Sequence, residues 1–343
     1  MKPLRLLPTR LRDTLRRASH RPSIPRSLPA VLRSLPAVLR SLLLPAGLLT
    51  GLFAGLFAGL LAAGCGSPHA SLQRRIDRLL DTCDGRVGVA AMLPDGAWIT
   101  HDDAPLPLMS VFKLPLAVAV LERAERLGIS LASPVEVGAE RLVAGTYSPL
   151  RDSLPAEGGT VALETLLRYS VSYSDNIACD LLLDAIGGPA ALDAFLRQRG
   201  CDGFTIRVDE AAMRADPAAQ RRNTAPPSAV VRLLDRLLRG ELLGAEATAR
   251  LCRLLEATTT GPDKLRAGVP AEVRLGHKTG SSDRIDGVRI ADNDAGYLLF
   301  PDGRRCCIAV FVAESRADDA ANAALIAAIA RTVCDYLAER TGG

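Results

Sequence analysis

A serine and a lysine three residues apart form the first pair in the chain that could do chemistry. In residues 110–113 (SVFK) the hydroxyl of Ser110 and the amine of Lys113 stand at positions i and i+3 of an expected helix start, on one face. A serine becomes a nucleophile when a neighbouring group takes its proton, and a lysine amine in a suitable environment can do so. The competing interpretation is an N-capping serine beside a lysine whose stem covers apolar surface.

Lysine is rare in this chain, which gives each lysine extra weight. Of the 42 basic residues only four are lysines, namely Lys2, Lys113, Lys264 and Lys278. Arginine keeps its proton near neutral pH, so a lysine kept in an arginine-rich chain is a candidate for chemistry that needs an amine.

Two tripeptides follow the serine–lysine pair in the sequence. Residues 174–176 (SDN) come after an apolar run and are expected to open a helix. Residues 278–280 (KTG) are expected to end a strand, and two further serines follow them. The chain therefore carries the motifs SxxK, SDN and KTG in that order.

With these three motifs the chain resembles the class A serine β-lactamases. The resemblance covers about residues 70–340, and the SDN form departs from the Tyr-x-Asn of class C enzymes. It implies an α+β fold of the serine β-lactamase and penicillin-binding type, an antiparallel sheet flanked by helices with an inserted all-helical domain. Tyr173 and the segment Thr258–Pro262 are similar to the PER-type extended-spectrum subgroup.

The resemblance also implies catalytic roles for the motif residues. Ser110 would attack the β-lactam carbonyl, and Lys113 is a candidate to take its proton. Ser174 would relay a proton towards the lactam nitrogen, with Lys278 beside it.

Substrate-binding roles are implied in the same way. Asn176 would hold the side-chain amide of the substrate, and Thr279 of the KTG motif would bind its carboxylate together with the motif lysine. Gly280 belongs to the same motif, and the backbone N–H of Ser281, with that of the nucleophile, would form the oxyanion hole. Lys264 matches a carboxylate-binding position that is arginine in some family members, and a solvated loop charge is its alternative.

The role of Glu210 would decide whether the chain is a hydrolase or a penicillin-binding protein. Class A enzymes use a glutamate on an ω-shaped loop to activate the water that hydrolyses the acyl-enzyme. Glu210 lies 36 residues after Ser174, within an ω-type loop expected at about residues 205–224. Asp209 and Asp216 are the other acidic candidates in this loop.

The loop departs from the common class A pattern at two places. Arg214 stands where an asparagine usually helps to hold the water, and Val208 and Asn223 stand where an Arg–Asp pair usually closes the loop. The PER-type subgroup departs at the same positions.

The elements that must position these residues follow from the apolar spacing. The pattern predicts helices over 68–82, 110–127, 160–170, 174–186, 189–199, 226–239, 244–257 and 318–339. Strands are predicted within 86–101 and over 272–279, 287–300 and 305–314. This order predicts a sheet domain of residues 66–105 plus 258–343 and a helical domain of residues 106–257.

Residues 1–64 are expected to be a low-complexity export leader. They carry ten basic residues against one acidic residue, and residues 42–63 are apolar and uncharged. The segment Leu61–Cys65 resembles a lipoprotein cleavage box with Ala62 in place of the usual leucine, so Cys65 would carry the lipid anchor. An ordinary cleavage site or an uncleaved anchor is the alternative, and each places the mature part in the periplasm or cell envelope.

Other functions are disfavoured by composition and by missing motifs. The remaining residues carry 32 basic and 37 acidic groups, so no nucleic-acid partner is expected. The chain has no GxGxxG, GxxxxGK[ST], HExxH or GxSxG motif, and neither a metal nor a cofactor is expected. A monomeric β-lactamase acting on penicillins and cephalosporins is the first hypothesis. A D,D-peptidase-like penicillin-binding protein and a non-catalytic cell-wall-binding lipoprotein are the alternatives.

Overall fold

The computed structural model describes residues 68–81 and 83–340. The chain divides into a unit of residues 1–64 and a unit of residues 65–343. The expected leader and the expected lipid-carrying Cys65 lie outside the described residues.

An antiparallel sheet forms the centre of the second unit. Its strand order is β2-β1-β10-β9-β7, and the short β8 pairs with β9. The strands are β1 (Arg86–Met92), β2 (Trp98–His101), β7 (Arg274–Ser281), β8 (Arg284–Ile285), β9 (Val288–Leu299) and β10 (Arg305–Ser315). β1 pairs with β10, so the hairpin before the helical segment and the strands after it form one sheet. This arrangement confirms the predicted α+β fold.

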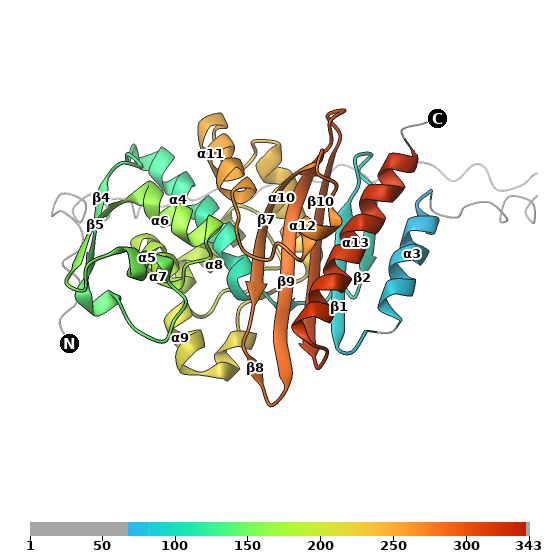
Figure 1. Cartoon of the computed structure of the whole chain (residues 1–343). Helices are drawn as coiled ribbons and strands as arrows, with labels where there is room; N and C mark the ends of the chain where they lie inside the picture. Colours follow the sequence, from blue (N-terminus) through green and yellow to red (C-terminus); the bar gives the residue numbers. More distant parts are fainter. Residues whose placement is uncertain (1–67, 82, 341–343) are drawn as a thin grey trace, which may run out of the picture. The chain divides into compact units, whose positions relative to one another are not determined.

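One face of the sheet is covered by helices from both ends of the unit. These are α3 (Ala70–Leu80), α12 (Leu265–Gly268) and α13 (Asp319–Glu339), of which α3 and α13 lie side by side (Figure 1). Successive strand residues point to opposite faces, so Val310 and Val312 pack under these helices while Ala309 and Phe311 pack on the other face. The sheet is therefore buried on both sides.

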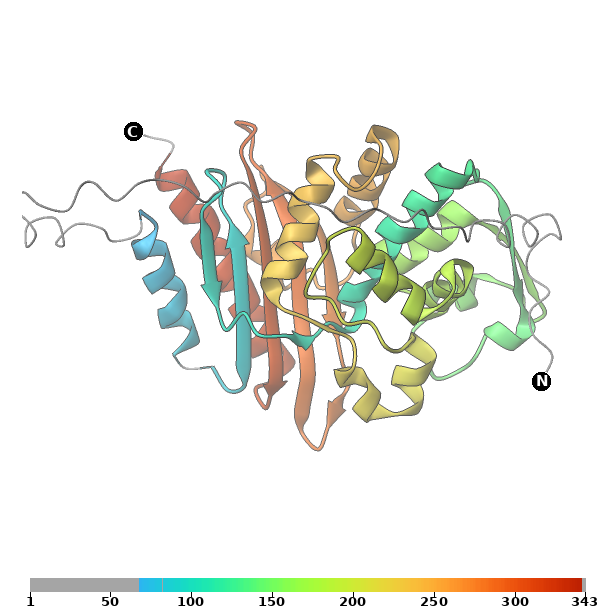
Figure 2. The same cartoon turned by 180° about the vertical axis from the view of Figure 1, so that it is seen from behind.

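The other face of the sheet packs against the helical segment, seen from behind in Figure 2. Its helices are α4 (Lys113–Leu127), α5 (Pro149–Ser153), α6 (Leu163–Ser172), α7 (Asn176–Ile186), α8 (Pro189–Gln198), α9 (Glu210–Ala215), α10 (Pro227–Leu238) and α11 (Ala245–Glu256). Every residue from Lys113 to Leu121 of α4 is buried. A helix that is apolar on all sides must lie inside the protein, so α4 forms the centre of this part.

Several short elements were not expected from the sequence. A 3₁₀ turn, η1 (Met109–Phe112), precedes α4, so Ser110 lies just before the α-helix rather than in it. Two short sheets pair β3 (Leu106–Pro107) with β6 (Thr224–Ala225) and β4 (Pro134–Gly138) with β5 (Gly158–Ala162). The two-residue strands are too short to show an alternating pattern in the sequence. Residues 160–162, predicted as the start of a helix, belong to β5, and the helix begins at Leu163. The seven cysteines of the described residues are free thiols.

Candidate active site

Ser110 lies on η1, which packs directly against strand β7. The preceding Met109 has φ +45°, a conformation that costs a residue with a side chain about 1–3 kcal/mol. A Cβ on Gly280 of β7 would lie 2.5 Å from Leu108 O and 3.0 Å from Ser110 N. Glycine is therefore needed for β7 to approach the backbone of Ser110 this closely.

Lys113 and Ser110 both contact the same carboxylate oxygen of Glu210. The Lys113 ammonium is fully buried, and its Nζ donates to Ser174 O (2.7 Å) and Asn176 Oδ1 (2.6 Å) and lies 2.9 Å from Glu210 Oε1. Ser110 Oγ donates to Glu210 Oε1 over 3.4 Å. The three acceptors match the three protons of an ammonium, and one of them is the Glu210 carboxylate.

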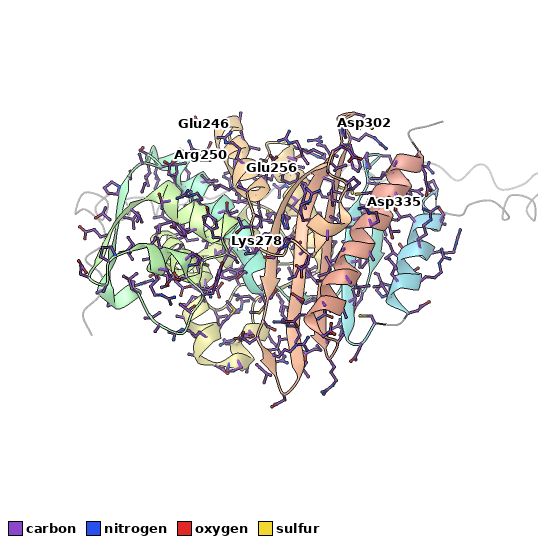
Figure 3. The ribbon with its side chains drawn as sticks, viewed as in Figure 1. Glu246, Arg250, Glu256, Lys278, Asp302 and Asp335 are labelled. Atoms are coloured by element: carbon purple, nitrogen blue, oxygen red, sulfur yellow. The ribbon has the colours of Figure 1, made fainter. Side chains whose placement is uncertain are left out.

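Lys278 and Ser174 form a second hydroxyl–amine pair. Lys278 Nζ donates to Ser174 Oγ (2.8 Å) and to Thr279 O (2.9 Å). Burial and the nearby Lys113 ammonium lower the pKa of Lys278 well below its usual value. Ser174 itself has φ +60°. Figure 3 places Lys278 on β7, at the side of the sheet next to the helical segment.

Lys264 lies beside the KTG strand but is paired with a carboxylate. Its Nζ donates to Asp292 Oδ1 (2.5 Å) and to Ser281 Oγ (2.8 Å), and Ser281 Oγ donates to the same Asp292 oxygen (2.8 Å). Asp292 is the register partner of Ser281 on β9. To bind a substrate carboxylate as predicted, Lys264 must act through Ser281 or exchange Asp292 for the substrate. The sequence motifs did not indicate Asp292.

The SDN tripeptide opens α7 as expected because it supplies its own cap. Asp175 accepts hydrogen bonds from Ala178 N (2.8 Å) and from Leu150 N (2.7 Å), which fixes the start of the helix. Asn176 Nδ2 donates to Thr146 Oγ1 (3.0 Å), and the neighbouring Tyr147 is an exposed aromatic ring. The structure thus brings the residues of all three motifs and Glu210 together.

Comparison with known proteins assigns the family. The model of the β-lactamase enzyme family matches residues 71–337. The chain belongs to this family. A β-lactamase of Bacteroides uniformis is 40% identical over 78% of this chain and 92% of its own length. The extended-spectrum β-lactamase PER-1 of Pseudomonas aeruginosa is 34% identical over 77% of this chain and 87% of its own length.

Solved structures agree with this assignment. A class A β-lactamase from Bacteroides cellulosilyticus is 38% identical and superposes with a TM-score of 0.77 over 80% of this chain and 99% of that one. A β-lactamase from Chitinophaga pinensis is 35% identical, with a TM-score of 0.76 over 78% of this chain and 99% of that one. The predicted resemblance to class A serine β-lactamases is confirmed, and the enzyme is a β-lactam hydrolase.

In this β-lactamase an amide closes the loop that carries Glu210. The buried Asn223 accepts from Arg207 N (2.8 Å) and Val208 N (3.1 Å) and donates to Val208 O (2.8 Å). Next to it, Thr205 and Thr224 exchange two backbone hydrogen bonds of 2.8 and 2.9 Å. Asn223 therefore does by hydrogen bonds what an Arg–Asp ion pair usually does in class A enzymes. Arg214 lies exposed in α9.

Asn223→Ala is expected to lower the free energy of unfolding by about 2–4 kcal/mol, because the buried N–H and C=O of Val208 and the N–H of Arg207 lose their partner. Urea denaturation of the purified enzyme measures the loss, and the deacylation rate should fall with it. Asn322→Ala on α13 is the matched control, since Asn322 is also buried and bonds Ser315 Oγ (2.8 Å) far along the chain from the loop. It should cost stability and leave deacylation unchanged, whereas equal deacylation losses in both variants would contradict the loop-closing role.

Proposed function

We propose that this β-lactamase hydrolyses penicillins and cephalosporins through an acyl-enzyme on Ser110, which is released by water activated by Glu210. The observation that carries the proposal is the position of Glu210 Oε1, 3.4 Å from Ser110 Oγ and 2.9 Å from the buried Lys113 ammonium. Lys113 Nζ contacts this oxygen as its ion-pair partner, and a carboxylate within reach of the acylated oxygen can take a proton from water.

Acylation uses the contact between η1 and β7. As Ser110 attacks, its proton passes to Glu210 Oε1, the oxygen that Ser110 Oγ and Lys113 Nζ both contact. The backbone N–H groups of Ser110 and Ser281 stabilise the negative charge on the carbonyl oxygen. Ser174 then gives its proton to the lactam nitrogen. Lys278, bonded to Ser174 Oγ, lowers the cost of the charge that this transfer leaves behind.

Substrate binding follows from the same arrangement. A substrate carboxylate next to Thr279 would give the buried Lys278 an ion-pair partner. Ser281 would offer its hydroxyl proton by turning away from Asp292, while Lys264 stays bonded to its oxygen. The carbonyl oxygen of Asn176 accepts from Lys113, and one proton of its amide nitrogen is donated to Thr146. The second amide proton is left for the acylamino carbonyl of the substrate.

The proposed substrate range extends to bulky cephalosporins. PER-1 is named an extended-spectrum enzyme. A relative from Klebsiella oxytoca, 36% identical over 74% of this chain, is named a carbapenem-hydrolysing enzyme. We further propose that the mature enzyme is a monomer exported to the periplasm and anchored by lipid on Cys65. Incorporation of labelled palmitate by the wild type and its loss in Cys65→Ser tests the anchor.

Turnover of nitrocefin by the purified enzyme tests the proposed reaction. A colour change with many turnovers per enzyme is expected, followed by hydrolysis of benzylpenicillin and cefotaxime. Peptide mass spectrometry of rapidly quenched samples should place the transient adduct on Ser110. A stable penicillin adduct without turnover would contradict the proposal, as would an adduct on another residue.

A further inference from the structure

Asp292 holds two hydrogen-bond donors of the side of the site where the substrate carboxylate is proposed to bind. Its Oδ1 accepts from Lys264 Nζ (2.5 Å) and from Ser281 Oγ (2.8 Å), and Lys264 Nζ also donates to Ser281 Oγ (2.8 Å). A hydroxyl has one proton, and Ser281 gives its proton to Asp292. A substrate carboxylate that approaches Ser281 therefore meets oxygen lone pairs, because the proton points away from it.

The three groups differ in how far solvent can reach them. Ser281 is exposed, whereas Lys264 and Asp292 are buried, with exposed fractions of 6% and 2%. An anion from solvent can thus contact the Ser281 hydroxyl, while the ammonium already has its counter-ion inside the protein. Because the ion pair is buried, salt and solvent weaken its attraction little, and a substrate has to compete with it.

The fold keeps Lys264 next to Asp292. Lys264 stands directly before α12, and the N–H of the following Leu265 donates to Asp294 Oδ2 (3.2 Å). Asp292 and Asp294 stand two positions apart on β9, so their side chains point to the same face of the sheet. The start of α12 is therefore tied to the strand that carries Asp292, and this carboxylate stays close to the ammonium as an intramolecular competitor.

Lys278 is the second cation on this side of the site. Its Nζ donates to Ser174 Oγ (2.8 Å) and Thr279 O (2.9 Å), and within residues 68–81 and 83–340 no carboxylate forms an ion pair with it. Without Asp292, a substrate carboxylate would find two lysines that lack a counter-ion. With Asp292 in place it finds one.

We propose that Asp292 is a specificity-determining residue, which withholds Lys264 and the Ser281 hydroxyl from the substrate and so lets the enzyme accept β-lactams whose carboxylate is masked. The proposal rests on the proposed binding of the substrate carboxylate beside Thr279. A carboxylate gains a charge-assisted hydrogen bond only where a donor is free to turn to it. Since Asp292 occupies both donors, an acid and its neutral ester differ less in binding than a free Lys264 would make them differ.

Benzylpenicillin and its methyl ester test the proposal, because they differ in this charge and in one methyl group. Asp292→Asn keeps the size of the side chain and an Oδ1 that can accept from Lys264 and Ser281, but it removes the negative charge. We expect the ratio of kcat/KM for the acid to kcat/KM for the ester to rise about 10-fold, the factor that one hydrogen bond to a charged group contributes. The rise should come from a lower KM for the acid, as expected for an interaction made equally in the ground state and the transition state. A change that merely disturbed the strand would slow both substrates alike and leave the ratio unchanged.

Two further variants keep the test valid if Asp292→Asn folds poorly. Asp292→Thr also removes the charge and introduces a residue that strands favour, so it should raise the ratio as well. Asp193→Asn on α8 is the matched control, because it removes the charge of another buried carboxylate, the partner of Arg197 and Arg207. It should leave the ratio unchanged. Melting temperatures show which variants are folded.

Lys264→Met distinguishes the two ways in which the proposal can fail. The variant should lower the acid-to-ester ratio, because Asp292 then repels the substrate carboxylate as an unpaired anion. An unchanged ratio in Lys264→Met would show that the substrate carboxylate does not bind on this side, which contradicts the proposed substrate binding and the role of Asp292 with it. A lowered ratio in Lys264→Met, beside wild-type ratios in Asp292→Asn and Asp292→Thr, would overturn the role of Asp292 alone.

Discussion

Glu210→Gln is expected to leave this β-lactamase able to react with penicillin but hardly able to hydrolyse the resulting acyl-enzyme. The amide keeps the size of the side chain and can still accept from Lys113 Nζ, but it cannot take a proton from water. General-base catalysis contributes about 10²- to 10⁴-fold, so the deacylation rate constant should fall by about that factor. In this variant Lys113 no longer faces a carboxylate and is the group left to take the proton of Ser110, so the acyl-enzyme still forms and accumulates.

The measurement is a single burst of nitrocefin hydrolysis equal to the enzyme concentration, with a stable adduct on Ser110 in the intact-protein mass spectrum. Asp216→Asn is the matched control, because Asp216 is an exposed acid of the same loop and asparagine preserves its hydrogen bond from Ala218 N (2.9 Å). Its turnover should stay near that of the wild type. Full hydrolysis by Glu210→Gln, or trapping by Asp216→Asn instead, would show that Glu210 is not the base.

The site residues that could be predicted from the sequence are those whose partners lie only a few positions away in the chain. Ser110 and Lys113 are brought together by helical spacing, and the start of α7 was predictable because Asp175 caps it within the SDN motif. The sheet and most helices were predictable from the spacing of apolar residues, because each element buries one or more faces in the core. These features need no knowledge of how distant segments pack.

The residues that sequence analysis missed act through contacts made only in the folded chain. Asp292 becomes the partner of Lys264 because the register of β7 and β9 sets it opposite Ser281. In the sequence Asn223 stands out only as a departure from a family pattern, because its three backbone contacts depend on the path of the loop. Asp180, which accepts from Glu210 N (2.8 Å) and Ala211 N (3.0 Å), had one usable signal. It stands four residues after Asn176, on the same face of α7.

Gly280→Ala is expected to slow acylation about 10²- to 10³-fold, the cost of losing one oxyanion-hole donor. The new Cβ would lie 2.5 Å from Leu108 O and 2.9 Å from Val111 N, and both are backbone atoms that cannot turn aside. β7 is held along its length by β9, so η1 is the part that must retreat. The N–H of Ser110 then moves away from the point where negative charge develops.

Stopped-flow acylation by nitrocefin measures this effect, and the melting temperature shows whether the fold is kept. Gly159→Ala in β5 is the control, because its Cβ would meet only the Leu154 side chain at 3.2 Å, which can move aside. Neither glycine has a positive φ, so the two variants differ in what the methyl group touches and not in backbone strain. Wild-type acylation by Gly280→Ala would mean that the close approach of β7 to η1 does not position the oxyanion donors. Slow acylation by Gly280→Ala together with wild-type acylation by Gly159→Ala would show that fast acylation depends on the close contact of β7 with η1.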